Sequence, residues 1–238
     1  MAQLERIALV TGANKGIGRE IARQLAEAGV TVLLGARDPA RGQSAAAEIA
    51  GATFLPLDVT KTDSIAAAAD TIAVEHGRLD VLVNNAAIFS AEDGTPARAC
   101  IAAVRQTIET NFLGALAVTQ AMLPLLHRSA GGRIVNLSSP LGSLAVAGDP
   151  SSPFNAYRLV GYNSSKAALN LLTLQLAADL AWSSVTVNAV VPGFVQTDLT
   201  DGQGTMSPAE GARLPVHYAL TAEPVSGRFD SPEGPVSW

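Results

Sequence analysis

The stretch Thr11-Gly12-Ala13-Asn14-Lys15-Gly16-Ile17-Gly18 decides how this chain is expected to fold. It joins residues 6–10, an apolar run typical of a buried strand, to residues 16–28, which have the pattern of an amphipathic helix. Glycines at such a junction allow a tight turn and let a pyrophosphate approach the positive end of the helix. No Lys-Ser or Lys-Thr pair follows them, so the turn is not a P-loop. A glycine-rich turn without a ligand is the alternative, but the strand before it and the helix after it favour a dinucleotide site.

The rest of the chain continues the alternation of strand-like and helix-like segments. We expect further strands at residues 31–34, 52–57, 79–83, 133–137 and 185–191. We expect helices at residues 39–50, 63–75, 96–127 and 162–182, and a final helix after a Gly-rich loop at 197–208. Because each crossover must return over a face, this order predicts one α/β domain over residues 1–238. The predicted architecture is a Rossmann-type doubly wound parallel sheet with helices on both faces.

Composition narrows the class of protein. The chain has 238 residues, 48% of them hydrophobic, and a net charge of -5, which argues against nucleic acid or an anionic membrane as a partner. Its single cysteine, Cys100, cannot form an internal disulfide. We see neither a signal peptide nor an apolar run long enough to span a bilayer, so we expect a cytoplasmic protein. The three histidines have no metal-ligand spacing, which predicts no metal site, and homo-oligomerisation is left open.

The end of the second strand indicates which dinucleotide is bound. A site that prefers NAD places a carboxylate about 20 residues after the glycines, and here Ala36 takes that place. Arg37 follows it, and Lys15 lies in the glycine turn. Each cation by itself is typical of a solvated surface, but together they fit the additional phosphate of NADP(H).

Further cofactor contacts are expected at the same edge of the sheet. Asp58 and Val59 follow the third strand, where a carboxylate can accept from an adenine amino group, although a loop-opening Asp is the simpler interpretation. Asn85 and Ala86 follow the fourth strand, where small residues let a cofactor lie against the backbone and Asn amides can tie strands together.

A tyrosine and a lysine four residues apart indicate acid–base chemistry. Tyr162 and Lys166 lie on one face of the predicted helix, where a nearby ammonium should lower the pKa of the phenol. Neither Tyr157 nor Tyr218 has a lysine four residues later. Upstream, the Ser138-Ser139 pair ends a strand, and a hydroxyl there can hydrogen-bond a substrate carbonyl oxygen. The pair lacks the Gly-x-Ser-x-Gly elbow of serine hydrolases.

In this order the motifs resemble the short-chain dehydrogenase/reductase family, and within it the carbonyl reductases, over nearly the whole chain. The resemblance implies that Tyr162 donates a proton, Lys166 holds the nicotinamide ribose and lowers the phenol's pKa, and Ser139 orients the carbonyl. It also implies that Asn111 positions a water and that residues 192–197 cover the nicotinamide. The implied cofactor-binding residues are Gly12, Asn14, Lys15, Gly16, Ile17, Gly18, Arg37, Asp58, Val59, Asn85, Ala86, Tyr162, Lys166, Pro192, Gly193, Val195 and Thr197.

The chain departs from the family pattern between its serine and its tyrosine. Residues 146–155, rich in Pro, Ser and Asp, form an insertion that we expect at the surface, and residues 148–153 should not be helical. Because the insertion joins Ser139 to Tyr162, we expect Phe154 and Tyr157 to wall the pocket opposite the substrate loop, residues 193–208. Ala87, which replaces the glycine of the family's Asn-Asn-Ala-Gly, is a minor change.

The function implied is an NADPH-dependent reductase that transfers a hydride to a ketone or aldehyde, with Tyr162 as proton donor. An NADP-dependent alcohol dehydrogenase working in the oxidative direction would use the same site. A non-catalytic dinucleotide sensor is the third alternative, but it should have lost Ser139, Tyr162 or Lys166, and all three are present.

Overall fold

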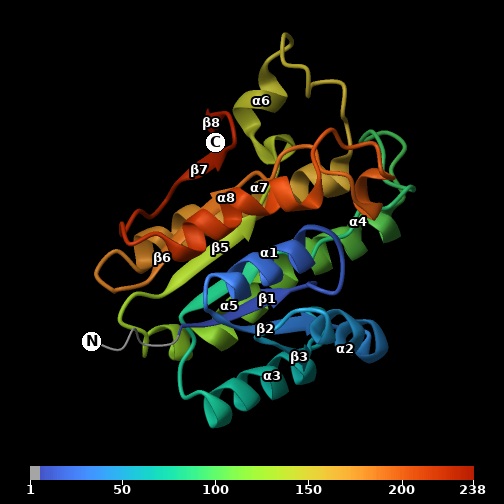
Figure 1. Cartoon of the computed structure of the whole chain (residues 1–238). Helices are drawn as coiled ribbons and strands as arrows, with labels where there is room; N and C mark the ends of the chain where they lie inside the picture. Colours follow the sequence, from blue (N-terminus) through green and yellow to red (C-terminus); the bar gives the residue numbers. More distant parts are fainter. Residues whose placement is uncertain (1–5) are drawn as a thin grey trace.

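A single sheet runs through the part of the chain that the structure describes, residues 6–238 of a computed structural model (Figure 1). The strand order is β3-β2-β1-β4-β5-β6-β7-β8. Every pairing is parallel except that of β8 with β7. The strands are β1 (Ile7–Thr11), β2 (Thr31–Ala36), β3 (Ala52–Pro56), β4 (Val81–Asn84), β5 (Arg133–Leu137), β6 (Thr186–Val190), β7 (Phe229–Ser231) and β8 (Gly234–Pro235).

Helices cover both faces of this sheet. They are α1 (Gly16–Glu27), α2 (Pro39–Ala47), α3 (Thr62–Glu75), α4 (Ile101–Ile108), α5 (Gly114–Leu126), α6 (Leu144–Gly148), α7 (Val160–Asp179) and α8 (Pro208–Leu220). Residues of α1, α2 and α8 share one apolar cluster, and residues of α3, α5 and α7 share a second. The predicted doubly wound α/β fold is therefore confirmed.

Strand β1 shows why its residues form the centre of the sheet. All five are buried, as expected of a parallel strand covered on both sides. Ile7 and Leu9 belong to the cluster beneath α3, α5 and α7, whereas Ala8 and Val10 belong to the cluster beneath α1, α2 and α8. Because successive side chains of a strand point to opposite faces of the sheet, this one apolar run contributes residues to the cores on both faces.

Several boundaries differ from the sequence expectations. The helix predicted at 96–127 begins at Ile101 and includes a π-helical turn, η1 (Glu109–Leu113), between α4 and α5. Helix α7 begins at Val160, two residues earlier than expected. Two further short helices are 3₁₀ turns, η2 (Pro140–Gly142) and η3 (Asp198–Thr200). Strands β7 and β8 were not predicted, because segments of three and two residues carry no readable alternation.

The topology opens a crevice where β1 and β4 lie side by side. From β1 the chain proceeds to β2 and β3 on one side, and then crosses to β4 on the other side. At such a switch point the loops leave in opposite directions and a ligand site forms at the carboxyl ends of the strands. Thr11 joins the two strands there, since its hydroxyl accepts from the backbone N–H groups of Asn85 and Ala86, each at 3.0 Å.

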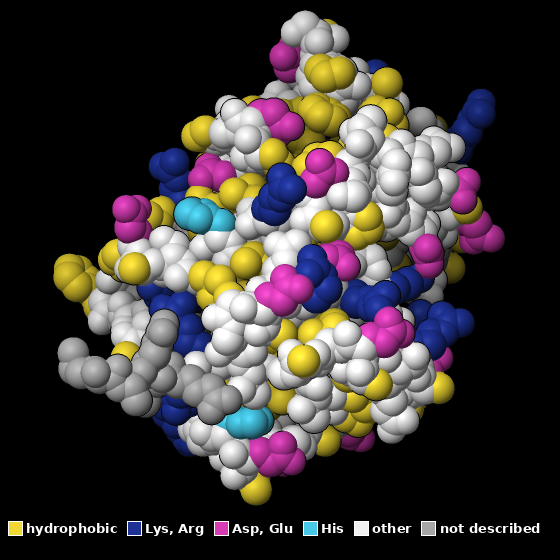
Figure 2. All heavy atoms as spheres, viewed as in Figure 1, with side chains coloured by type: hydrophobic (Ala, Val, Ile, Leu, Met, Phe, Trp, Pro, Cys, Tyr) yellow, Lys and Arg dark blue, Asp and Glu magenta, His cyan; other side chains and the backbone are white. Residues whose placement is uncertain are grey.

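One face of the molecule shows how charges are distributed on the surface. On the face shown in Figure 2, acidic and basic side chains are interspersed among small apolar patches. Among the described residues, no helix has the length and apolar character needed to cross a bilayer.

Candidate active site

The crevice contains a cavity of about 470 Å³ at the carboxyl edge of the sheet. Its lining comes from the glycine turn, the ends of β2, β3 and β4, the first turns of α7 and the loop after β6. All but two of the predicted cofactor residues line it, namely Gly12, Asn14, Lys15, Gly16, Ile17, Gly18, Arg37, Asp58, Val59, Asn85, Ala86, Tyr162, Lys166, Pro192 and Thr197.

The glycine turn is shaped for close approach of the backbone to a ligand. Gly12 and Gly16 have φ values of 63° and 56°, which residues with a Cβ rarely adopt. A Cβ on Gly12 would lie 2.9 Å from the Cα of Ala86, so only glycine fits beside β4. Lys15, the N-cap of α1, does not cap the helix with its own side chain. The turn and the helix N-terminus therefore fit the pyrophosphate of a dinucleotide.

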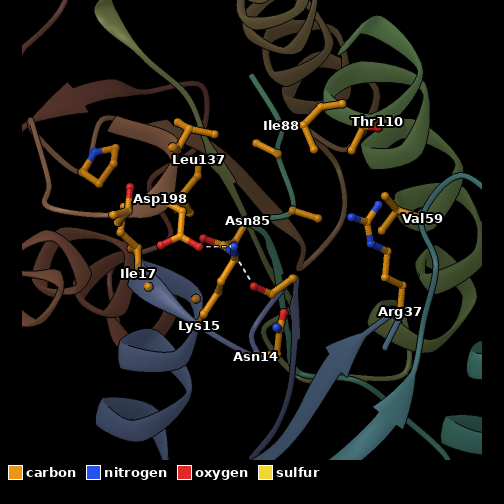
Figure 3. Close-up of a pocket in the computed structure, with 18 of the residues that line it drawn as sticks. Asn14, Lys15, Ile17, Arg37, Val59, Asn85, Ile88, Thr110, Leu137 and Asp198 are labelled. Carbon is orange, nitrogen blue, oxygen red and sulfur yellow. Dashed lines mark hydrogen bonds and ion pairs between the residues drawn. The ribbon is translucent and has the colours of Figure 1, made fainter. Parts of the chain in front are cut away.

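The two cations predicted to select the cofactor lie on different sides of the cavity. Figure 3 shows Arg37 beside Val59, whereas Lys15 turns away from it toward Asp198. Lys15 and Asp198 form an ion pair between the glycine turn and η3, although both side chains are largely exposed. Burial opposes a fall in the pKa of the Asp58 carboxyl, but hydrogen bonds from Thr60 and, to a smaller extent, the charge of Arg37 lower it.

Tyr162 lines the cavity, whereas Ser139, which does not line it, interacts with the Tyr162 side chain. Their hydroxyls form a side-chain hydrogen bond, and the Ser139 hydroxyl also accepts from the N–H of Leu141 at 3.2 Å. Ser138 is buried and donates to Asn170 Oδ1 at 2.5 Å, so its hydroxyl is used in a buried hydrogen bond with α7. Of the two adjacent serines, Ser139 is thus the one that reaches Tyr162.

Gly142 explains how η2 and α7 come so close together. A Cβ at this position would lie 2.6 Å from the carbonyl carbon of Lys166. The glycine three residues after Ser139 therefore lets the serine-bearing turn pack directly on the helix that carries Tyr162.

The pKa of Tyr162 differs from the value expected from its spacing to Lys166. Burial raises the pKa of Tyr162 to about 12, although the hydrogen bond to Ser139 opposes the rise. Burial also lowers the pKa of Lys166 to about 8. The Lys166 ammonium lies 5.7 Å from the centre of the Tyr162 ring and donates to the carbonyl of Leu137 at 2.8 Å. The expected fall in the phenol's pKa is absent here because desolvation disfavours the phenolate.

Asn111 lies behind the cavity wall. It is 1% exposed and belongs to the π-helical turn η1, a distortion that is frequent at functional sites. Its amide accepts from the Ile88 N–H at 2.8 Å and donates to the Ile88 carbonyl at 3.0 Å and to Ser165 Oγ at 3.1 Å. Asn111 thus ties the loop after β4 to α7.

Two predicted cofactor residues, Gly193 and Val195, do not line the cavity. Gly193 has a φ of 94° and turns the chain against the side chain of Met206. Val195 is 2% exposed and pairs with Met206 in an isolated bridge, so it packs under the loop. The loop faces the cavity instead through Gln196, which lies in the stretch expected to cover the nicotinamide, and through Asp198, Leu199 and Pro208 of the predicted substrate loop.

Other lining residues were missed. They are Leu57, Thr60, Ala87, Ile88, Thr110, Leu137 and Ser138. Each lies within two positions of a predicted site residue, so adjacency at a strand end or a helix turn was the available signal.

The insertion does not wall this cavity, so that prediction was wrong. Phe154 and Tyr157 line a second cavity of about 380 Å³, together with residues of α6 and the outward face of α7. Only Gly148 of residues 148–153 is helical, as the last residue of α6. Tyr162 lines the first cavity and Asn163, the next residue of α7, lines the second, because successive residues of a helix face different directions.

Comparison with known proteins agrees with this architecture. Residues 6–207 match the short chain dehydrogenase family. Short-chain dehydrogenase anuI of Penicillium roqueforti (strain FM164) is 35% identical over 92% of this chain and 90% of its own length. Carbonyl reductase (NADPH) 1 of Sus scrofa is 35% identical over 100% of this chain and 96% of its own.

A solved structure gives the same result in three dimensions. The NADPH-bound carbonyl reductase from chicken fatty liver superposes with a TM-score of 0.85 at 30% identity, covering 98% of this chain and 99% of that one. The sheet order, the glycine turn at the switch point and the Ser139–Tyr162–Lys166 cluster thus occur in a chain that belongs to the short-chain dehydrogenase family.

Proposed function

We propose that this protein is an NADPH-dependent reductase that transfers a hydride to a ketone or aldehyde, with Tyr162 as the proton donor. The observation that carries the proposal is that Tyr162, whose side chain interacts with Ser139, lines the same cavity as Arg37 and the glycine turn. The proton donor and the residues that would hold the cofactor therefore line one cavity.

The residues of the cavity suit NADPH. The glycine turn and the N-terminus of α1 would hold the pyrophosphate, and Asp58 would accept from the adenine amino group. Arg37 would pair with the 2′-phosphate, and Lys15 would join it by exchanging Asp198 for the phosphate. Bound in this way, NADPH would supply the hydride. The pig and chicken relatives, which are named for NADPH or contain it, support this choice of cofactor.

The protein's own groups act on the carbonyl oxygen of the substrate. Ser139 donates a hydrogen bond that orients and polarises the carbonyl. Tyr162 transfers its phenolic proton to this oxygen as negative charge develops there. Lys166 holds the nicotinamide ribose, and Asn111 keeps the loop after β4 in place and positions a water that returns the proton to Tyr162.

The raised pKa of Tyr162 favours the reductive direction. With a pKa of about 12, the phenol is protonated throughout the neutral range. That is the form required to donate a proton, whereas alcohol oxidation needs the phenolate. The chain's one cysteine fits the cytoplasmic location that we infer for the enzyme.

The test is a panel of ketones and aldehydes assayed by NADPH absorbance with the unmodified protein and two variants. Tyr162→Phe removes one hydroxyl and little volume, so turnover should fall by 100-fold or more, on the order of one general acid's contribution. NADPH binding, followed by fluorescence, should remain within about threefold. Tyr157→Phe, at an exposed tyrosine outside the cavity, is the matched control and should retain full turnover. Retention of most activity in Tyr162→Phe would mean that another group is the acid.

A further inference from the structure

Residues 88–94, which we call the strap, lie in the loop between β4 and α4 and pack against the first turn of α7. At its start, both backbone groups of Ile88 are bonded to the buried Asn111 amide. Next along it, the Phe89 ring meets the Tyr162 ring edge-on, with centroids 6.3 Å apart and planes at 84°. At its end lie Asp93 and Gly94, which contact α7 directly.

Asp93 caps the helix that carries Tyr162. Its Oδ1 accepts from the N–H of Gly161 at 2.9 Å, and its Oδ2 accepts from the N–H of Tyr162 at 2.8 Å. The adjacent carbonyl of Gly94 accepts from the N–H of Val160 at 2.9 Å. Three consecutive first-turn donors of α7 are thus satisfied by two neighbouring residues of the strap.

The helix has no cap of its own. Its N-cap residue is Leu159, whose side chain cannot accept a hydrogen bond. The first N–H groups of a helix need outside partners, and negative charge at this end is favourable to the helix dipole. Asp93 supplies both from a position 68 residues earlier in the chain.

Gly161 makes this close approach possible. A Cβ at this position would lie 3.1 Å from Asp93 Oδ2 and 3.1 Å from the Cα of Val104. The strap, α4 and the first turn of α7 therefore pack without slack. Asp93 is also held from its own side, because its Oδ1 accepts from the N–H of Gly94 at 2.8 Å and its N–H donates to the Ser90 carbonyl at 3.0 Å.

From this geometry we infer that Asp93 is a positioning residue for Tyr162. The carboxylate holds the tyrosine's own backbone N–H and so sets where the phenol stands relative to Ser139. The inference rests on the proposed function, in which Tyr162 transfers the proton. The glycine turn and Arg37, which would hold the phosphates of NADPH, belong to other elements, so loss of Asp93 should disturb proton transfer far more than NADPH binding.

The magnitude follows from the sensitivity of transfer steps to geometry. A displacement of about 1 Å at a reacting group costs on the order of 100-fold in rate. Asp93→Ala removes both acceptors, and we expect kcat to fall by about 10- to 100-fold with KM for NADPH within twofold. Asp93→Asn keeps one acceptor and should recover at least a third of this loss on a logarithmic scale. The solvent deuterium isotope effect on kcat should rise in Asp93→Ala, because proton transfer becomes more rate-limiting.

Asp80→Asn is the matched control for a purely structural effect. Asp80 also accepts from a backbone N–H, that of Ile7 at 2.9 Å, but it lies just before β4, at the opposite edge of the sheet. This variant should lower the melting temperature without changing kcat or the isotope effect of the folded enzyme. Asp93 would be a stability residue only, and the inference overturned, if Asp93→Ala behaved in the same way.

Hydrogen exchange provides a readout that needs no turnover. In Asp93→Ala, the amides of residues 160–162 should exchange at least 10-fold faster, whereas the first turn of α8, capped by its own Ser207, should be unchanged. Unchanged protection at residues 160–162 overturns the inference whatever the activity. If the unmodified protein reduces no carbonyl in the panel, the proposed function fails, and the exchange experiment still decides whether Asp93 holds this turn.

Discussion

At the scale of single residues, Arg37 is the side chain on which the choice of cofactor depends. It stands beside Val59 inside the cavity, and no acid occupies the preceding position, Ala36 (Figure 3). Arg37→Ala should raise KM for NADPH by 10-fold or more, because a hydrogen bond to a charged group contributes about 1.5–3 kcal/mol. KM for NADH should change little.

A matched arginine elsewhere controls for the loss of charge. Arg23 pairs with Glu20 and Glu27 on α1 and does not line the cavity. Arg23→Ala should leave both Michaelis constants unchanged. Steady-state kinetics with the two cofactors decides the matter, and equal or better turnover with NADH in the unmodified protein would refute the preference.

At the scale of elements, the insertion and α6 line the second cavity, not the one that contains Tyr162. Replacing residues 149–153 with two glycines should therefore leave turnover of small carbonyls and their ranking within about twofold. The melting temperature should move by only a few degrees, because these residues are exposed or partly buried. A changed ranking of bulky against small ketones, measured over the same panel, would mean that the insertion does line the substrate pocket.

At the scale of the whole molecule, the buried Lys166 links stability to pH. Its pKa is about 8 in the folded protein against an ordinary value of 10.5, so between these pH values the unfolded chain binds the additional proton. The contribution of this group to the free energy of unfolding therefore rises with pH across that window. Below pH 8 the destabilisation caused by burying the charged ammonium is fully present. Lys166→Met should be inactive yet more stable at pH 7 by about 1–3 kcal/mol.

Denaturant unfolding at several pH values checks this expectation. The advantage of Lys166→Met should shrink as pH rises and vanish near pH 10.5, the ordinary pKa of lysine. Lys61→Met makes the same change at an exposed position and should show no such trend. A constant difference between the Lys166 variant and the parent at all pH values would mean that packing, not the buried charge, is responsible.

The sequence by itself was sufficient for the features that local patterns encode. The apolar run at β1, the glycine turn and the start of α1 are contiguous, so their periodicity predicted the strand–turn–helix unit and the cofactor seat. The i,i+4 spacing placed Tyr162 and Lys166 on one helix face for the same reason. Asp38 and Pro39 likewise predicted the beginning of α2, where Asp38 accepts from the N–H of Arg41 at 3.0 Å.

The tertiary structure alone decided what depends on residues distant in sequence and on burial. The capping of α7 by Asp93 spans 68 positions, and no local pattern connects the two. The π-helical turn contains Asn111, whose side chain accepts a hydrogen bond from Ile88 in the loop after β4, 23 positions earlier. The direction of the Tyr162 pKa shift was predicted wrongly because spacing indicates a neighbouring charge but not desolvation. Burial is a property of the assembled core, and here it outweighs the hydrogen bond to Ser139, which lowers the pKa of the phenol.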